Sequence, residues 1–184
     1  MNQGYPARNK ESISGLIERV TYFNEESGFV VLRVKIKGRR DLLTVVGQSI
    51  SANAGEWVKA EGVWARDREH GLQFKAERLV CTPPTNIEGI EKYLASGMIK
   101  GIGPVYAKKM VTRYGEKIFD IIETASAKLE SIDGIGPGRR RKIKDAWQEQ
   151  KVVRKIMVFL HSNGVSTSRA VRIYKTYGEE AIEK

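Results

Sequence analysis

The sequence has very little cysteine, histidine and proline. Cys81 is the one cysteine among 184 residues, and there are two histidines and five prolines. A single cysteine excludes a disulfide framework and a metal site built from cysteines. His70 and His161 have no carboxylate or cysteine partner at metal-ligand spacing, so we expect a loop position for the first and a core position for the second.

Long apolar runs are also missing. No stretch approaches the roughly 20 residues that a membrane-spanning helix needs. Residues 1–10 are polar, lack the apolar core of a signal peptide and are expected to form a disordered tail. We therefore expect a cytoplasmic location and no membrane partner. No Gly-x-x-x-x-Gly-Lys-Ser/Thr motif occurs, so we expect no ATP hydrolysis and no cofactor in this stretch of chain.

Acidic residues are too few to balance the basic ones. There are 22 Asp and Glu against 32 Lys and Arg, which gives a net charge of +10. An excess of this size favours a polyanionic partner, usually nucleic acid. Charge alone does not distinguish such a protein from one that is merely basic.

One short pattern occurs twice in the second half of the chain. Residues 99–104 read Ile-Lys-Gly-Ile-Gly-Pro and residues 132–137 read Ile-Asp-Gly-Ile-Gly-Pro. Glycine adopts positive φ angles and has no side chain to block a close approach. A Gly-Ile-Gly bend before a helix therefore offers bare N–H groups to an anion. We expect these glycines to bind DNA phosphates: Gly101, Gly103, Gly134 and Gly136.

A third, altered copy follows at 164–166. When Gly101 is aligned with Gly164, Ala107 falls on Ala170 and Tyr114 on Tyr177, which indicates a repeated supersecondary unit. Ser166 stands where the other copies have their second glycine, and no proline follows it. We therefore expect the third copy to pack rather than to bind phosphate.

Basic residues follow both glycine patterns. Lys108 and Lys109 come after the first, and Arg139 and Arg140 lie in the first helical turn after the second. Cations at a helix N-terminus oppose the helix dipole, a cost that is tolerable where a phosphate is to be bound. We expect all four to contact the DNA backbone, without reading sequence and with strong dependence on salt.

Residues 11–82 have the pattern of a small β domain. Apolar residues alternate along 30–36, the period of a half-buried strand. Turn residues separate five expected strands, at 13–22, 29–36, 42–46, 57–64 and 72–79. Five short strands favour a Greek-key barrel of the OB type, and strand number leaves an SH3-like barrel open.

One face of the second expected strand carries Phe29, Arg33 and Lys35. An aromatic ring among cations on an OB-type sheet is typical of single-strand binding by stacking and charge. Packing of Phe29 against the neighbouring domain is the alternative. Trp57 and Trp64 are seven positions apart and cannot share a face of a regular strand, so at least one is expected in the core.

After residue 82 the pattern becomes helical. Two prolines at 83–84 end the strand pattern, and Thr85 with Glu88 fits a capping box. Apolar residues then recur at helical spacing. We predict an α+β fold, with an OB-like barrel followed by an all-α tandem helix-hairpin-helix array over 83–184. Residues 177–184 restart the pattern of 114–119, so we expect a truncated last repeat and a chain that is the N-terminal piece of a longer protein.

Three segments carry a family resemblance: 24–32, 93–104 and 159–166. In this order, and with the linking segments between them, they resemble the N-terminal region of the RecD-like DNA helicases, the exonuclease V alpha-subunit group found without RecB and RecC. The resemblance implies a monomeric, ATP-dependent 5′→3′ helicase of superfamily 1 in repair and recombination. ATP and Mg²⁺ would bind in motor domains that follow this region, which itself would bind single-stranded or junction DNA and carry no catalytic residue.

Two rival interpretations remain. A RuvA-like clamp for Holliday junctions also places an OB barrel before tandem hairpins, but it works as a tetramer. A protein-interaction scaffold would use the hairpins to dock a partner. The helix expected between the barrel and the first glycine pattern favours the helicase interpretation over the clamp.

Overall fold

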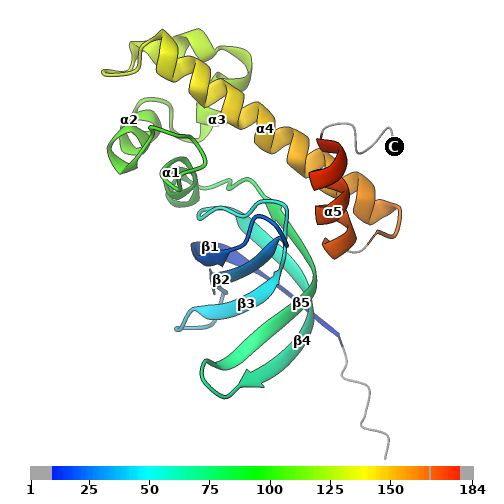
Figure 1. Cartoon of the computed structure of the whole chain (residues 1–184). Coiled ribbons are helices and arrows are strands. Elements are labelled where there is room, and N and C mark those ends of the chain that lie inside the picture. Colours follow the sequence, from blue (N-terminus) through cyan, green and yellow to red (C-terminus); the bar gives the residue numbers. More distant parts are fainter. Residues whose placement is uncertain (1–9, 166, 179–184) are drawn as a thin grey trace, which may run out of the picture.

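The computed structural model describes residues 10–165 and 167–178. The tail expected over 1–10 lies outside these residues apart from Lys10, and so do Ser166 and the repeat restart at 179–184. Figure 1 shows a β barrel at one end and an array of helices at the other, with one long helix crossing the array.

The first part of the chain closes into a five-stranded barrel. Its order is β1-β2-β3-β5-β4, in which β3 and β5 are parallel and the other neighbours antiparallel. This confirms the predicted barrel and, with the helices that follow, the α+β class. The strands are β1 (Glu11–Phe23), β2 (Phe29–Lys35), β3 (Leu43–Gln48), β4 (Trp57–Asp67) and β5 (Gly71–Thr82).

Alternation along β2 separates the barrel core from its surface. Val30, Leu32 and Val34 are fully buried, because every second side chain of a strand points to the same face. Trp64 packs edge-on against buried Phe74, with ring centroids 5.2 Å apart, while Trp57 is exposed. Trp64 is thus half-buried against the core rather than within it, so the expectation of a core tryptophan is met only in part.

The second part consists of short helices and one long one. They are α1 (Ile87–Leu94), α2 (Pro104–Tyr114), α3 (Ile118–Thr124), α4 (Pro137–Ser162) and α5 (Thr167–Tyr177), with 3₁₀ turns η1 (Gly115–Lys117) and η2 (Ser126–Ser131). The predicted N-cap at Thr85 is wrong by one residue. Asn86 caps α1, since its side-chain oxygen accepts a hydrogen bond from the Gly89 amide at 2.8 Å.

Three bends join these helices: the first bend (residues 99–103), the second bend (132–136) and the third bend (163–165). The isoleucines at the centres of the first two, Ile102 and Ile135, are only 4% and 3% exposed. Both belong to the core that α1, α2, α3 and the start of α4 share. Each bend is thus anchored by one buried side chain, while its glycines remain at the surface.

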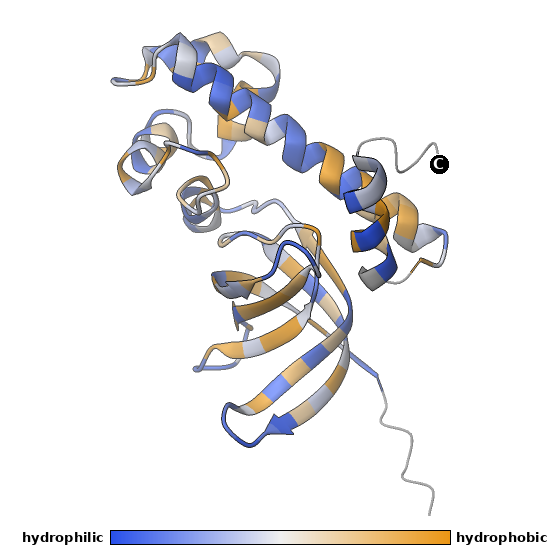
Figure 2. Ribbon diagram, in the orientation of Figure 1, coloured by the Kyte–Doolittle hydropathy of each residue, from blue (hydrophilic) through white to orange (hydrophobic). Residues whose placement is uncertain are grey.

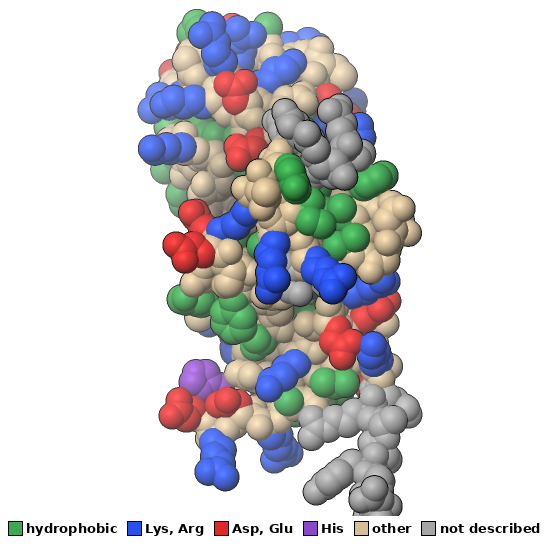
Figure 3. Space-filling view, turned by 45° about the vertical axis from the view of Figure 1, so that its right-hand side comes forward, with side chains coloured by type: hydrophobic (Ala, Val, Ile, Leu, Met, Phe, Trp, Pro, Cys, Tyr) green, Lys and Arg blue, Asp and Glu red, His purple; other side chains and the backbone are tan. Residues whose placement is uncertain are grey.

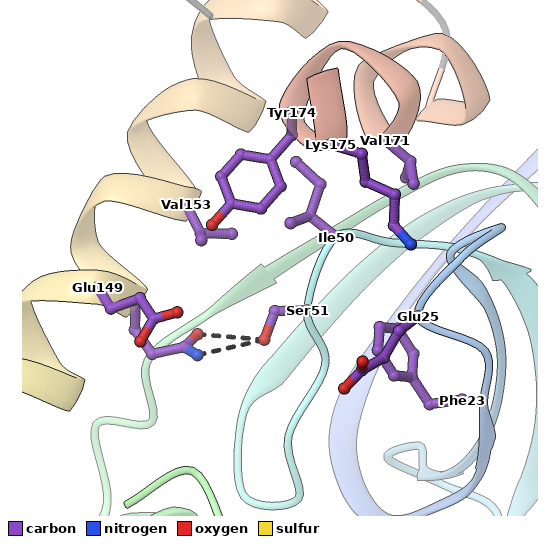
Figure 4. Close-up of a pocket in the computed structure, with 10 residues that line it drawn as sticks. Phe23, Glu25, Ile50, Ser51, Glu149, Val153, Val171, Tyr174 and Lys175 are labelled. Carbon is purple, nitrogen blue, oxygen red and sulfur yellow. Dashed lines mark hydrogen bonds between the residues drawn. The ribbon is translucent and has the colours of Figure 1, made fainter. Parts of the chain in front are cut away.

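Buried polar contacts join the barrel to the helices. The Arg154 guanidinium on α4 lies 3.5 Å from the carboxylate of Glu56 and donates a hydrogen bond to the Tyr93 hydroxyl of α1 at 2.6 Å. Glu56 is 2% exposed. Burial raises the pKa of Glu56 to about 7, because the loss of hydration outweighs the attraction of Arg154. A second tie is the hydrogen bond between Gln150 and Ser51, drawn in Figure 4.

Helix α5 packs against the barrel and the end of α4. Ala170 and Val171 are buried, and a Cβ on Gly28 would lie 2.8 Å from the Val171 side chain. Figure 2 shows α4 mostly hydrophilic along its first half and hydrophobic near α5. A pocket of about 370 Å³ remains between α4, α5 and the barrel, and its lining includes Tyr174, Lys175 and Glu25 (Figure 4). The third repeat thus packs, as expected.

Candidate nucleic-acid interface

The first bend leads directly into α2. Gly101 has φ +90°, and the Ile102 amide donates to the Ile99 carbonyl at 3.2 Å. Gly103 is the N-cap of α2 in an extended conformation, and Pro104 occupies the first helical position. A Cβ on Gly101 or on Gly103 would meet nothing within 4 Å. The amides at the start of α2 are therefore open to an anion from solvent.

The second bend repeats this backbone. Gly134 has φ +89°, and the Ile135 amide donates to the Ile132 carbonyl at 3.0 Å. The Arg140 amide donates to the Gly136 carbonyl at 2.9 Å, matching the bond from Ala107 to Gly103 at 3.0 Å. Gly134 and Gly136 are both exposed. Two bends of the same form are thus presented at the starts of α2 and α4.

A basic groove lies between α2 and the second bend. Its volume is about 860 Å³, and its floor includes the exposed side chain of Val105. Lys108 is exposed, whereas Lys109 lies 3.9 Å from the Asp133 carboxylate and donates to the Asp133 carbonyl at 3.4 Å. Figure 3 shows Lys and Arg side chains gathered at the upper end of the molecule, where the helical array lies. Three cations and one carboxylate line the groove: Lys108, Lys109, Arg113 and Asp133.

The two arginines after the second bend differ in position. Arg139 lies beside the glycines, and its Nη1 donates to the Gly134 carbonyl at 2.8 Å. Arg140 turns toward Glu130, with its Nε 3.8 Å from the carboxylate and buried without a hydrogen-bond partner among the described residues. The structure therefore brings Arg139 to the bend and directs Arg140 elsewhere, which weakens the prediction that Arg140 binds phosphate.

On the barrel, Phe29 lies at the surface at 38% exposure. Its ring centroid is 6.0 Å from that of exposed Tyr22 on β1. Arg33 donates to the Thr44 hydroxyl of β3 at 2.5 Å, and Lys35 is exposed. The ring contact of Phe29 is therefore with another surface aromatic of the barrel. The two rings are inclined by 57° to each other, and each offers an aromatic surface for stacking with an unpaired base.

Comparisons with known proteins follow the same division of the chain. Residues 10–84 match the OB-fold domain of the ATP-dependent DNA helicase YrrC. Residues 85–149 match the SAM-like helix-hairpin-helix tandem family, and residues 149–184 match the helix-hairpin-helix domain of the ATP-dependent RecD2 DNA helicase. These matches support a RecD-like helicase N-terminal region.

A curated relative supports the same assignment. The chain is 25% identical over 178 residues to the ATP-dependent RecD2 DNA helicase of Deinococcus radiodurans. The match covers 94% of this chain and 25% of the relative, so the chain spans about a quarter of the length of that helicase. The OB-fold match also decides against the SH3-like barrel.

Sequence reasoning missed two aromatic residues of this RecD-like region. Tyr106 on α2 lies against the second bend, since a Cβ on Gly134 would be 2.8 Å from its ring and from its hydroxyl oxygen. Tyr22 forms the ring pair with Phe29. The sequence did contain one indication for Tyr106. When Gly101 is aligned with Gly134, Tyr106 aligns with Arg139, a predicted phosphate contact in the first turn after the bend.

His70 lies in the exposed turn between β4 and β5, as expected, but it does have a carboxylate neighbour, because its Nδ1 is 3.4 Å from Asp67. Asp67 accepts hydrogen bonds from the amides of Glu69 and His70, which lower its pKa.

The described residues contain no cluster of three or more His, Cys, Asp or Glu that could hold a metal ion. None of their helices is long and apolar enough to cross a membrane. The side chain of His161 lies outside the description.

Proposed function

We propose that this chain is the DNA-holding region that precedes the motor of an ATP-dependent 5′→3′ helicase of superfamily 1, acting in repair and recombination. Its partners are single-stranded or junction DNA and the helicase's own motor domains, and the unit is a cytoplasmic monomer. ATP and Mg²⁺ bind in those motor domains. The family matches and the relative's name as a DNA helicase support this proposal.

The two exposed bends carry the DNA-binding part of the proposal. Each presents glycine amides at the N-terminus of a helix, and the partial positive charge of that terminus attracts a phosphate. Backbone amides meet the phosphates of any sequence alike, so they hold DNA without selecting a site. A region that must let DNA pass into a motor requires this kind of contact.

The barrel supplies a different kind of contact. Rings stack on the faces of unpaired bases, and a base in a duplex already stacks on its neighbours. The Tyr22–Phe29 pair, with Lys35 on the same strand as Phe29, therefore suits a single strand. We propose that the bends hold the backbone and that the barrel holds unpaired bases.

Direct titration tests the proposal. Fluorescence anisotropy with labelled single-stranded and junction DNA, at about 50 and about 200 mM salt, should show binding that weakens steeply as salt rises. The double variant Lys108→Ala/Arg139→Ala should bind more weakly with a shallower salt dependence. Lys155→Ala, which removes one exposed cation from the far half of α4, is the control and should behave as the parent.

Two results would overturn the proposal. If the parent chain binds neither DNA at low salt, the bends do not hold the backbone, and the scaffold interpretation is favoured. If a sizing column shows a tetramer that binds the junction and ignores the single strand, the chain is a junction clamp. A monomer that binds the single strand supports the helicase assignment.

A further inference from the structure

Tyr106 reaches from the first helix-hairpin-helix unit to the second. It lies in the first turn of α2, just after the first bend, yet its ring covers the second bend. A Cβ on Gly134 would lie 2.8 Å from both its Cε1 and its hydroxyl oxygen. Real Cβ atoms do not approach so closely, so only glycine at 134 allows this ring position.

The same ring supports two cations. The Arg139 guanidinium carbon lies 4.5 Å from the ring centroid, and the Lys109 ammonium lies 5.4 Å from it. Both distances are within the range of a cation–π contact. Arg139 also donates to the Gly134 carbonyl at 2.8 Å, so its guanidinium is held from two sides.

Tyr106 and Arg139 occupy the same position in the two repeats. Alignment of Gly101 on Gly134 places one directly on the other. Contact between equivalent positions is what arises when two copies face each other across a local two-fold axis. The chain thus places an aromatic ring in one copy and a cation in the other, at the point where the copies meet.

We propose that Tyr106 is a positioning residue that holds Arg139 ready for the phosphate bound at the second bend. This inference rests on the proposed function. A free arginine side chain loses rotamer entropy when binding immobilises it. Because the Tyr106 ring and the Gly134 carbonyl restrict Arg139 beforehand, much of that cost is met before DNA arrives. The guanidinium has five N–H groups, and among the described residues the Gly134 carbonyl accepts a hydrogen bond from one of them.

The test is a mutant cycle read out as DNA affinity and salt slope, using the whole chain and a labelled single strand. Arg139→Ala should weaken binding by about three- to tenfold, as expected for one lost hydrogen-bonded contact. Tyr106→Leu, which removes the ring face, should weaken it by about two- to tenfold. In the Arg139→Ala background Tyr106→Leu should cost little further, because the other cation at the ring, Lys109, is also held by Asp133.

Two controls separate positioning from general damage. Tyr106→Phe keeps the ring face and should retain the parent affinity and salt slope. Arg141→Ala, in the same turn of α4 and exposed, should combine additively with Tyr106→Leu. Thermal unfolding of each variant reports whether the fold persists.

The outcomes separate the inference from the function it rests on. If Tyr106→Leu weakens binding equally with and without Arg139, its role is structural and the inference is overturned. It is also overturned if Tyr106→Phe loses affinity, or if Arg139→Ala binds as the parent does. If the parent itself does not bind DNA, the proposed function fails, and the inference fails with it.

Discussion

The first and second bends share a sequence pattern and a backbone conformation, but they have different surroundings. Gly101 and Gly134 have φ angles of +90° and +89°. Around Gly101 there is open space, whereas Gly134 lies under the ring of Tyr106. At the first bend, glycine is thus required only because the backbone adopts a positive φ angle. At the second bend, glycine is required for a second reason as well, because a Cβ would clash with the Tyr106 ring.

The difference arises where the two repeats meet. At the same position after the bend, the first repeat has Tyr106 and the second has Arg139. Their contact is asymmetric, because the Tyr106 ring lies over the second bend and stacks with Arg139. The next position along holds Ala107 in the first repeat and Arg140 in the second. Ala107 is fully buried, so Arg140 occupies an inward-facing position and only its length brings its charge to Glu130. Repetition of a motif therefore does not imply repetition of its contacts.

Alanine at each left-handed glycine should give the largest contrast. Gly101→Ala should lower the free energy of unfolding by about 1–2 kcal/mol, the cost of a left-handed conformation with a Cβ. Gly134→Ala should cost about 1–3 kcal/mol more, because the new methyl group displaces Tyr106. Urea denaturation of the two variants checks this. Equal losses would mean that the Tyr106 contact has no energetic weight.

The barrel offers a test of whether the bends act alone. Phe29→Ala should weaken binding of single-stranded DNA by about 1–3 kcal/mol, since a stacked base loses its platform. Binding to duplex DNA should not change. Leu72→Ala, an exposed apolar residue at the start of β5, is the control. If Phe29→Ala leaves single-strand affinity intact, the bends account for binding by themselves.

The arginine beside the second bend should affect the salt dependence. Arg139→Ala should reduce the slope of log affinity against log salt by about 0.7–0.9, the value for one lost phosphate contact. Anisotropy titrations over a series of salt concentrations measure this slope. An unchanged slope would remove Arg139 from the interface and leave the glycine amides as the contact.

The smallest effect is expected at the neighbouring position. Arg140→Ala restores the alanine that the first repeat has there, and Arg140 faces Glu130 rather than the bend. The salt slope should stay at the parent value, and the free energy of unfolding should change by no more than about 0.5 kcal/mol. A slope reduced as much as in Arg139→Ala would show that Arg140 leaves Glu130 to bind phosphate.

The parts of this fold that were predictable from sequence depend on local pattern. Alternation along β2 fixed which side chains enter the barrel, and the Gly-Ile-Gly pattern fixed both bends, since each follows from the conformational freedom of nearby residues. The cap of α1 was misplaced by one residue because Thr85 and Asn86 are both good N-caps.

The parts that were missed depend on how separate elements face each other. The Tyr22–Phe29 pair requires the register between β1 and β2, which shifts twice at irregularities along β1. The position of Tyr106 over Gly134 requires the orientation of one repeat against the other. The inward-facing position of Arg140 could have been predicted from the repeat alignment, because Arg140 aligns with Ala107, which is buried.

Helix α4 joins the second bend to the third repeat as one continuous element. Its 26 residues extend for about 39 Å without a break, from the second bend, past the Arg154–Glu56 pair, to the contact with α5 (Figure 1). Because Gln150 and Arg154 tie this helix to the barrel close to its midpoint, the spacing between the second bend and the third repeat is set by the length of a single helix.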